Sequence, residues 1–301
     1  ERLRANHNAR VYTTSESAIG WIAENLAFTN LPEKIEVFKN KAKFRELMRP
    51  MLPNFYFQEV PFEVLNTLKI NDIPLPFVIK PNVGFFSLGV HIVNSVEEWG
   101  AVKAAIKAEV AERDATYPNE VLNTTTFIIE EMIEGEEFAF DAYFDQEGTH
   151  GILGIYHHIF SSTDDVGDRM YSTSAKIINP LRFGGWCTTA DITAAAYGFN
   201  PYVYYFENKR PDWDEILSTR AGKTYSMVIL DNVTDLANED IESFDYDALL
   251  KRLENPLELR KLDHKEYPIF GFLFMETSAE NSGELGWMLR TSLREFITTN
   301  S

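Results

Sequence analysis

The stretch that most limits how this chain can fold is PFVIKPNVGFFSLGVHIVNSVEEW, residues 76–99. An apolar strand ends there at Lys80, and a loop separates it from a second apolar run. The loop contains three small residues, Gly84, Ser87 and Gly89. A flexible loop with free backbone N–H groups beside a fixed cation suits a chain of phosphates. An ordinary hairpin tip with a surface lysine explains the stretch equally well when it is taken alone.

The pattern of apolar residues around this loop predicts a small unit of mixed helix and strand. Strands are expected at 77–80, 89–93 and 126–130, with a helix over 95–112 before the third strand. The residues SVEE, from Ser95 to Glu98, have the pattern of a capping box that would open this helix. The predicted order is therefore strand, lysine, loop, strand, helix.

A second informative stretch is FIIEEMIEGEEFAFDAYFD, residues 127–145. An apolar strand ends in two acids, and a turn at Gly135 leads into a strand that alternates from 136 to 144. Such a turn can bind an adenine ring, because its backbone groups pair with the base edge and a later carboxylate can bind the ribose hydroxyls. The alternation alone also fits a strand with one polar side facing solvent. One face of it would carry Phe138, Phe140, Ala142 and Phe144.

The remaining segments predict further helices and buried strands. Helices are expected over 14–28, 40–48 and 283–298, and buried strands at 224–231 and 268–276. Residues 186–198 are expected to form a loop and then a helix, which Thr188 or Thr189 would cap and Gly198 would end. The stretch LPEKIEVFKNKAKFRELMRPML holds a short strand-like piece ahead of the helix at 40–48, and residues 54–75 are mixed. His157 and His158 occupy neighbouring strand positions, and we expect a structural role for both.

The composition excludes several classes of partner. The chain has 301 residues and a net charge of −18, which argues against a nucleic-acid groove or an anionic membrane surface. Its single cysteine, Cys187, cannot form an internal disulfide, which fits the reducing cytoplasm. No apolar run approaches the roughly 20 residues that a membrane helix needs. A cytoplasmic location is therefore expected.

Taken in order, these motifs resemble the ATP-grasp superfamily. The resemblance runs through NKAKFREL, FVIKPNVGFFSLGV, FIIEEMIEGEEFAFDAYFD and INPLRFGG, and it covers most of residues 35–210. It implies an α+β ATP-grasp fold, in which two α+β subdomains hold the nucleotide between them. The implied division is an N-terminal segment at 1–76, a small lid at 77–133 and a larger core at 134–301.

The resemblance also implies which residues bind the phosphates of ATP. Lys41 and Lys80 match the two lysines that reach the phosphates, and Ser87 and Gly89 match the lid loop that folds over them. A lysine on the surface of a helix is the competing interpretation for Lys41. For Lys80 the interpretation as a surface lysine is weaker, because the motifs on both sides of it match the family in the same order.

The second stretch matches the part of the family that binds the nucleoside. Glu130, Glu131 and Ile133 match the adenine hinge, where Glu130 and Ile133 would act mainly through their backbone. Glu137 matches the acid that binds the ribose. An exposed acidic turn is the competing interpretation for this group.

The sequence departs from the family where metal ligands are expected. The family generally holds two Mg²⁺ ions with an acid from one strand and an acidic-x-Asn pair from the next. Asn179 matches that asparagine, but Ile177 stands where the pair should have its acid. Either the protein lacks the metal acids, or a segment of a few tens of residues is absent from the sequence at the junction between 177 and 178.

The implied function is an ATP- and Mg²⁺-dependent ligase that joins a carboxylate to an amine, or less often a thiol, through an acyl phosphate. Small-molecule carboxylates and amines would be its partners. Arg182 and Arg169 are the expected catalytic residues, although a solvated loop also explains Arg169. A catalytically inactive ATP-binding module is the alternative, and a kinase or other phosphotransferase on the same fold is a second rival.

Overall fold

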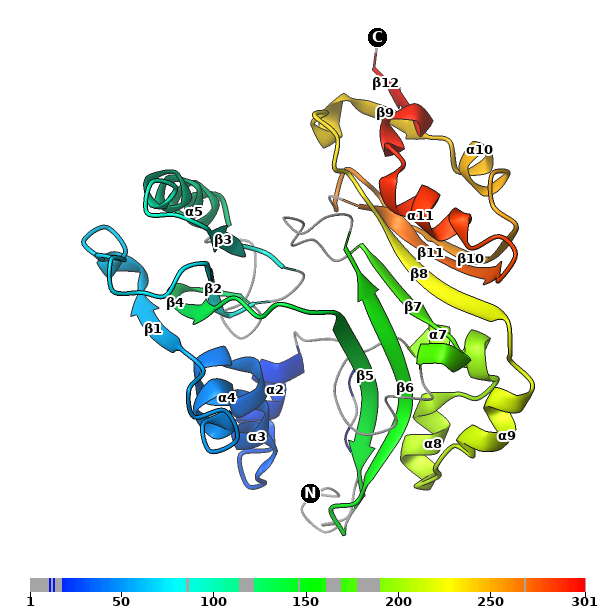
Figure 1. Ribbon diagram of the computed structural model, residues 1–301, viewed down its shortest axis with the longest axis horizontal. Coiled ribbons are helices and arrows are strands. Elements are labelled where there is room, and N and C mark those ends of the chain that lie inside the picture. Colours follow the sequence, from blue (N-terminus) through cyan, green and yellow to red (C-terminus); the bar gives the residue numbers. More distant parts are fainter. Residues whose placement is uncertain are drawn as a thin grey trace. The chain divides into compact units, whose positions relative to one another are not determined.

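The computed structural model describes residues 11, 13, 18–84, 87–113, 122–145, 147–160, 169–177, 190–267 and 269–300. Within them the chain divides into two compact units, Val11–Glu134 and the residues from Gly135 onward. Each unit contains helices and an antiparallel sheet of its own (Figure 1). The expected α+β class is confirmed.

The unit from Val11 to Glu134 is built on a four-stranded antiparallel sheet with the order β1-β4-β2-β3. Its strands are β1 (Phe57–Pro61), β2 (Phe77–Val83), β3 (His91–Val93) and β4 (Asn123–Glu131). Its helices are α2 (Ala18–Asn25), α3 (Leu31–Lys39), α4 (Lys41–Met48) and α5 (Trp99–Arg113), with a 3-10 turn η1 (Phe62–Val64).

The two faces of this sheet differ in polarity because side chains alternate along a strand. Phe77 and Ile79 of β2 are fully buried and belong to a cluster that includes Trp99 and Ile106 of α5. The opposite face of β2 carries Lys80 and Asn82. The apolar face therefore forms the core of the unit, and the polar face is where the candidate site residues gather.

Helix α2 ends at Asn25, before the predicted end at 28, and two further elements of this unit differ more from the sequence prediction. Residues 31–39 form a helix rather than a strand, because Pro32 and Glu33 favour the first helical turn and Lys39 favours the last. The helix predicted over 95–112 begins instead at Trp99. The Glu98 carboxylate accepts the backbone N–H of Asn94 at 2.9 Å, so it closes a separate turn ahead of the helix.

Strand β1 lies within residues 54–75, for which the sequence pattern predicts no regular element. It pairs only with β4 in this sheet, with Phe57 opposite Glu130 and Pro61 opposite Thr126. Its position makes β4 a central strand, with β1 on one side and β2 on the other.

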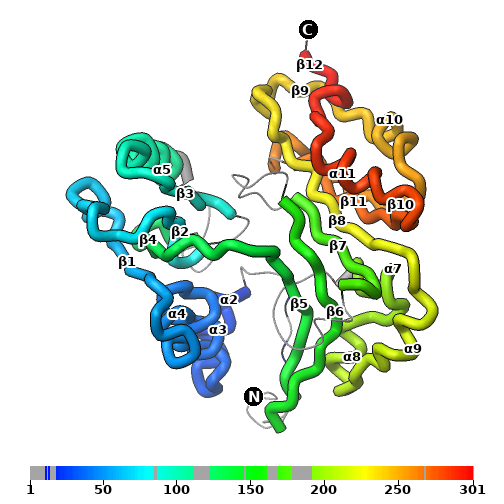
Figure 2. Tube along the Cα trace, in the orientation of Figure 1, coloured from blue at the N-terminus to red at the C-terminus, as the bar shows by residue number. Residues whose placement is uncertain are grey.

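The unit from Gly135 onward has a six-stranded antiparallel sheet with the order β10-β11-β8-β7-β6-β5. These strands are β5 (Glu137–Phe144), β6 (His150–Ile159), β7 (Met170–Thr173), β8 (Lys223–Asp231), β10 (Asn255–Lys261) and β11 (Ile269–Ser278). Strands β9 (Ile241–Phe244) and β12 (Ile297–Thr299) form a small second sheet. In Figure 2 the strands can be followed side by side across the sheet from β5 to β10.

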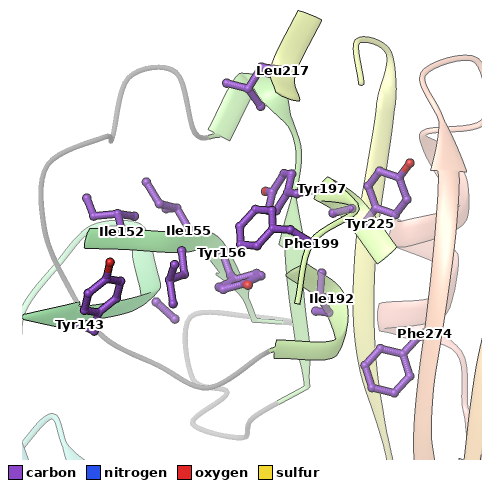
Figure 3. Close-up of a cluster of buried hydrophobic side chains, with 13 residues drawn as sticks. Tyr143, Ile152, Ile155, Tyr156, Ile192, Tyr197, Phe199, Leu217, Tyr225 and Phe274 are labelled. Atoms are coloured by element: carbon purple, nitrogen blue, oxygen red, sulfur yellow. The ribbon is translucent and has the colours of Figure 1, made fainter. Parts of the chain in front are cut away.

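Helices cover both faces of the six-stranded sheet. They are α7 (Ala190–Tyr197), α8 (Pro201–Glu207), α9 (Trp213–Ser218), α10 (Tyr246–Leu250) and α11 (Gly283–Arg290), with 3-10 turns η2 (Asn238–Asp240) and η3 (Leu293–Phe296). Tyr225 of β8 packs with α7 and α9 in the cluster that Figure 3 shows. Val228 and Leu230 of the same strand pack with α10 and α11 in a second cluster. Alternating residues of β8 thus serve two cores.

Helix α7, followed by Gly198, and strands β8 and β11 confirm the predictions for those segments over their described residues. The burial along β5 follows the alternation predicted for 136–144, because Ala139 and Tyr143 are buried while Phe144, on the other face, is exposed. A register shift in the pairing with β6 lies between Asp141 and Ala142. The helix predicted over 283–298 ends at Arg290. No described helix is long and apolar enough to cross a membrane.

The C-terminal helix stops early for a local reason. Thr291 has extended backbone, with φ −64° and ψ 130°, and the Ser292 side chain accepts the backbone N–H of Arg294. This contact starts the separate turn η3, after which β12 pairs with β9. Hydroxyl side chains that bond to the nearby backbone compete with helix in this way.

Candidate functional site

The polar face of the four-stranded sheet is organised around one buried carboxylate. Glu130 of β4 forms an ion pair with Lys80 of β2 through Oε1. Its other oxygen, Oε2, accepts the Nε–H of Arg45 of α4 at 2.7 Å. The side chain of Glu130 is 5% exposed, against 21% for Lys80 and 19% for Arg45. We call these three residues the Glu130 cluster.

The cations beside this carboxylate favour its ionised form. Burial by itself would raise the pKa of Glu130, but the hydrogen bond from Arg45 and the charges of Lys80 and Arg45 outweigh it and hold that pKa below its ordinary value. Two cations and one anion leave the Glu130 cluster with one net positive charge. Lys80 and Arg45 keep about a fifth of their side chains exposed, so solvent contacts this charge.

The second expected lysine, Lys41, lies on helix α4 and contacts the end of strand β2. Lys41 is the first residue of α4, and its Nζ donates to the carbonyl oxygen of Pro81 at 3.1 Å. Asn82 holds the helix there, because its Oδ1 accepts the backbone N–H of Ala42 at 2.8 Å and its Nδ2 donates to Glu59. Asn82 is buried, so the beginning of α4 is fixed against β2.

The loop after β2 turns back closely over that strand. Ser87 and Gly89 both have left-handed backbone, with φ values of 53° and 72°, and Val90 N–H donates to the carbonyl of Ser87 at 3.2 Å. A Cβ atom at Gly89 would lie 3.0 Å from Cγ of Pro81, and one at Gly84 would lie 3.9 Å from Nζ of Lys41. Lys41 and the loop are therefore neighbours.

Replacing Gly89 with alanine is expected to lower the free energy of unfolding by about 1–3 kcal/mol, because the new side chain meets both a left-handed backbone and the ring of Pro81. Gly148→Ala is the matched control, since Gly148 has φ 79° but no neighbouring atom within 4 Å of the added Cβ. Chemical denaturation measures both variants. Equal losses would mean that the contact with Pro81 contributes nothing.

The residues after Glu130 continue the sheet before they leave it. The backbone N–H of Glu131 donates to the carbonyl of Tyr56 at 3.0 Å, and that of Met132 donates to the carbonyl of Pro76 at 3.3 Å. Both N–H groups therefore already have hydrogen-bond acceptors within this unit. Ile133 follows with its side chain 65% exposed, which leaves an apolar surface at the predicted hinge.

Glu137, the predicted ribose acid, lies in the other unit at the beginning of β5. Its carboxylate is 62% exposed, and its Oε1 lies 2.7 Å from Nδ1 of His158, the residue opposite it on β6. His158 is buried and stacks on Tyr171, with ring centroids 4.4 Å apart. A buried imidazole therefore fixes the direction of an exposed carboxylate.

The expected catalytic and metal-binding residues are only partly within the described chain. Arg169 precedes β7 and lines a small hollow with Met288 and Leu293. Asn179 and Arg182 lie outside the described residues, as does residue 178 at the predicted junction. Across the parts of the chain that the structure describes, no group of three or more His, Cys, Asp and Glu residues could hold a metal ion.

Arg45 is the site residue that sequence reasoning missed. It lies 85 positions from Glu130 in the sequence, so no local pattern joins them. The available signal was its spacing from Lys41, because residues four apart lie on the same face of a helix.

Residues 73–179 match the family model of the ATP-grasp domain. Among solved structures, the chain is similar to an L-amino acid ligase from Bacillus licheniformis, with a TM-score of 0.63 and 17% identity over 100% of this chain and 83% of that one. It is also similar to N5-carboxyaminoimidazole ribonucleotide synthetase from Thermus thermophilus, with a TM-score of 0.54 and 12% identity over 96% and 81% of the two chains. A search among curated proteins finds no match.

The likeness extends to a biotin carboxylase from Campylobacter jejuni, with a TM-score of 0.52 and 10% identity over 93% of this chain and 74% of that one. At such identities the likeness concerns the fold. The resemblance drawn from the sequence is confirmed by the family match and by this fold together. Residues 73–179 thus match an ATP-grasp domain, and the α+β structure has the fold of ATP-grasp enzymes over nearly the whole chain.

Proposed function

We propose that this protein is an ATP- and Mg²⁺-dependent ligase that joins a small carboxylate to an amine, or less often to a thiol, through an acyl phosphate. The observation that carries the proposal is the Glu130 cluster, which holds Lys80 on the strand that leads into the loop of Ser87 and Gly89. The shared fold with an L-amino acid ligase supports a reaction of this class.

The residues present fit an anionic nucleotide. Lys80 and Lys41 lie on and beside one strand and would bind the phosphates, while Ser87 and Gly89 belong to the loop that would cover them. Ile133 offers an exposed apolar side chain for the adenine ring. ATP would supply the phosphoryl group that activates the substrate carboxylate.

The work of the protein in this reaction is mainly electrostatic. Two lysines neutralise the negative charge that spreads over phosphate oxygens as the phosphoryl group is transferred. Glu130 fixes the direction of the Lys80 ammonium group, and closure of the loop excludes water, which would hydrolyse an acyl phosphate. In the same proposal Glu137 binds the ribose hydroxyls, with His158 fixing its direction.

Substrate and metal contacts complete the proposal. Arg182 and Arg169 are assigned to the substrate carboxylate or the transferred phosphate, and Asn179 to Mg²⁺. The described residues hold no set of ligands suited to the metal, so we derive no step from it.

Release of ADP that requires both an acid and an amine is the expected result with purified protein, ATP and Mg²⁺. Pairs of L-amino acids are the first substrates to test, with ADP measured by a coupled assay and the condensed product by mass spectrometry. ADP release with one acceptor and a phosphorylated product would identify a kinase instead and contradict the ligase.

ATP binding without turnover is the second candidate function. Ile177 favours it, because an aliphatic side chain stands two positions before Asn179, where the family has an acid. If this candidate is right, ATP binds, no pair of substrates releases ADP, and Mg²⁺ leaves the dissociation constant for ATP unchanged. A strong dependence of that constant on Mg²⁺ would argue against it.

A further inference from the structure

Arg45 has no role in the proposed chemistry, yet it is bound to the side chain that holds Lys80. Its Nε donates to Oε2 of Glu130 at 2.7 Å, and its guanidinium lies 4.5 Å from the centroid of the Phe55 ring. The side chain is four-fifths buried, with 19% exposed. These contacts fix the guanidinium in one place on the polar face of the sheet.

The position of Arg45 on α4 relates it to both expected phosphate ligands. Lys41 and Arg45 are one helical turn apart and lie on the same face of α4. Lys41 binds the end of β2, and Arg45 binds Glu130, which in turn binds Lys80. One helix face therefore fixes one lysine directly and the other through a carboxylate.

The charges of the Glu130 cluster give Arg45 a second effect. Lys80 and Arg45 share the negative charge of Glu130, each through a different oxygen. Without Arg45, the whole carboxylate charge would act on Lys80, and the net charge of the cluster would fall from +1 to zero. An anion approaching Lys80 would then meet a neutral pair instead of a net cation.

Resting on the proposed function, we infer that Arg45 is a positioning residue for phosphate recognition. It holds Glu130 and offsets its charge, so that Lys80 remains available to the phosphates of ATP. The inference concerns the phosphates alone, and adenosine, which has none, is the probe that separates this effect from a general disturbance of the domain.

Arg45→Met is expected to raise the dissociation constant for ATP by about tenfold or more, because one net charge is lost beside the phosphates. The constant for adenosine should stay within about twofold. Arg45→Lys should recover part of the loss, since it restores the charge but not the hydrogen-bond geometry of a guanidinium. Isothermal titration calorimetry on the full chain measures each constant.

Arg49→Met is the matched control. Arg49 lies one turn further along, pairs with Glu46 at 2.7 Å and lies 4.7 Å from the Phe57 ring, but it does not contact Glu130. The same replacement there should leave the constant for ATP unchanged. An equal effect of both replacements would overturn the inference, because general loss of surface charge would then explain it.

The double variant Arg45→Met with Glu130→Gln gives a sharper test. Removing the carboxylate charge frees Lys80 again, so the double variant should bind ATP more tightly than Arg45→Met alone. Weaker binding by the double variant, in protein shown to be folded by circular dichroism, would overturn the inference.

The outcome also distinguishes this inference from the proposed function. A protein that binds ATP but joins no acid to an amine would refute the ligase, while the ratio of the constants for ATP and adenosine would still decide the role of Arg45. Failure of the unaltered protein to bind ATP would overturn both.

Discussion

Replacing Lys80 with methionine is expected to weaken ATP binding by at least about 30-fold and to abolish measurable turnover. Truncating one partner of a buried charge pair costs about 2–5 kcal/mol, and each 1.4 kcal/mol corresponds to about a tenfold change in the dissociation constant. The loss should be large because Glu130 remains behind with Arg45 as its partner and leaves no net positive charge for the phosphates.

Lys43→Met provides the control for this prediction. Lys43 lies on the same helix as Lys41, its side chain is 53% exposed, and it pairs with Glu36 on the surface. Its replacement removes the same charge from the protein without touching the Glu130 cluster. A dissociation constant for ATP that changes less than about threefold in the Lys80 variant would refute the assignment of Lys80 to the phosphates.

Replacing Glu130 with alanine is expected to lower the free energy of unfolding by about 3 kcal/mol. Removing one partner of a buried ion pair costs about 3–5 kcal/mol, and the lower end applies because Lys80 and Arg45 keep about a fifth of their side chains exposed. The variant leaves these two cations facing each other without a carboxylate. Glu131→Ala, at the next and more exposed position of β4, should cost clearly less.

The contribution of Glu130 to the free energy of unfolding should decrease at acidic pH. Its pKa is lowered in the folded protein from the ordinary value of 4.5, so its contribution to stability is complete above that value and is lost as the pH falls through the folded pKa. The difference between wild type and the Glu130 variant should therefore be constant near neutral pH and shrink below pH 4.5. A difference that grows on acidification would show that the carboxylate is not ionised in the folded state.

The sequence predicts those parts of the fold and the site that local patterns determine. The strand that carries Lys80 and the loop with Gly89 are contiguous, and the structure has both, although β2 continues past Lys80 to Val83. The strand around Ile129 is apolar enough to be identified alone, and β4 confirms it. Helix α4 follows Asn40, which caps it through its side chain at Lys43 N–H.

The parts that the sequence does not predict depend on residues far apart in the chain. Strand β1 is stabilised by β4, whose residues lie much later, and its own burial pattern has only Val60 buried. The register shift after Asp141 depends on pairing with β6, which a count of alternating residues cannot reveal. The hinge motif predicts a role for the backbone of Glu130. The role of its side chain cannot be predicted from that motif, because it depends on the positions of Arg45 and Lys80, which are distant in the sequence.

The strand order β1-β4-β2-β3 has a consequence for how the protein is synthesised. The central strand β4 is the last of the four to leave the ribosome, so β1 and the inner edge of β2 have no strand partner until Asn123–Glu131 has emerged. A nascent chain at that stage exposes unpaired strand edges, which are the features that favour misassociation and attract holding chaperones. Lys80 likewise acquires its carboxylate only when β4 arrives, so this domain completes its sheet and its cationic site in the same cotranslational step.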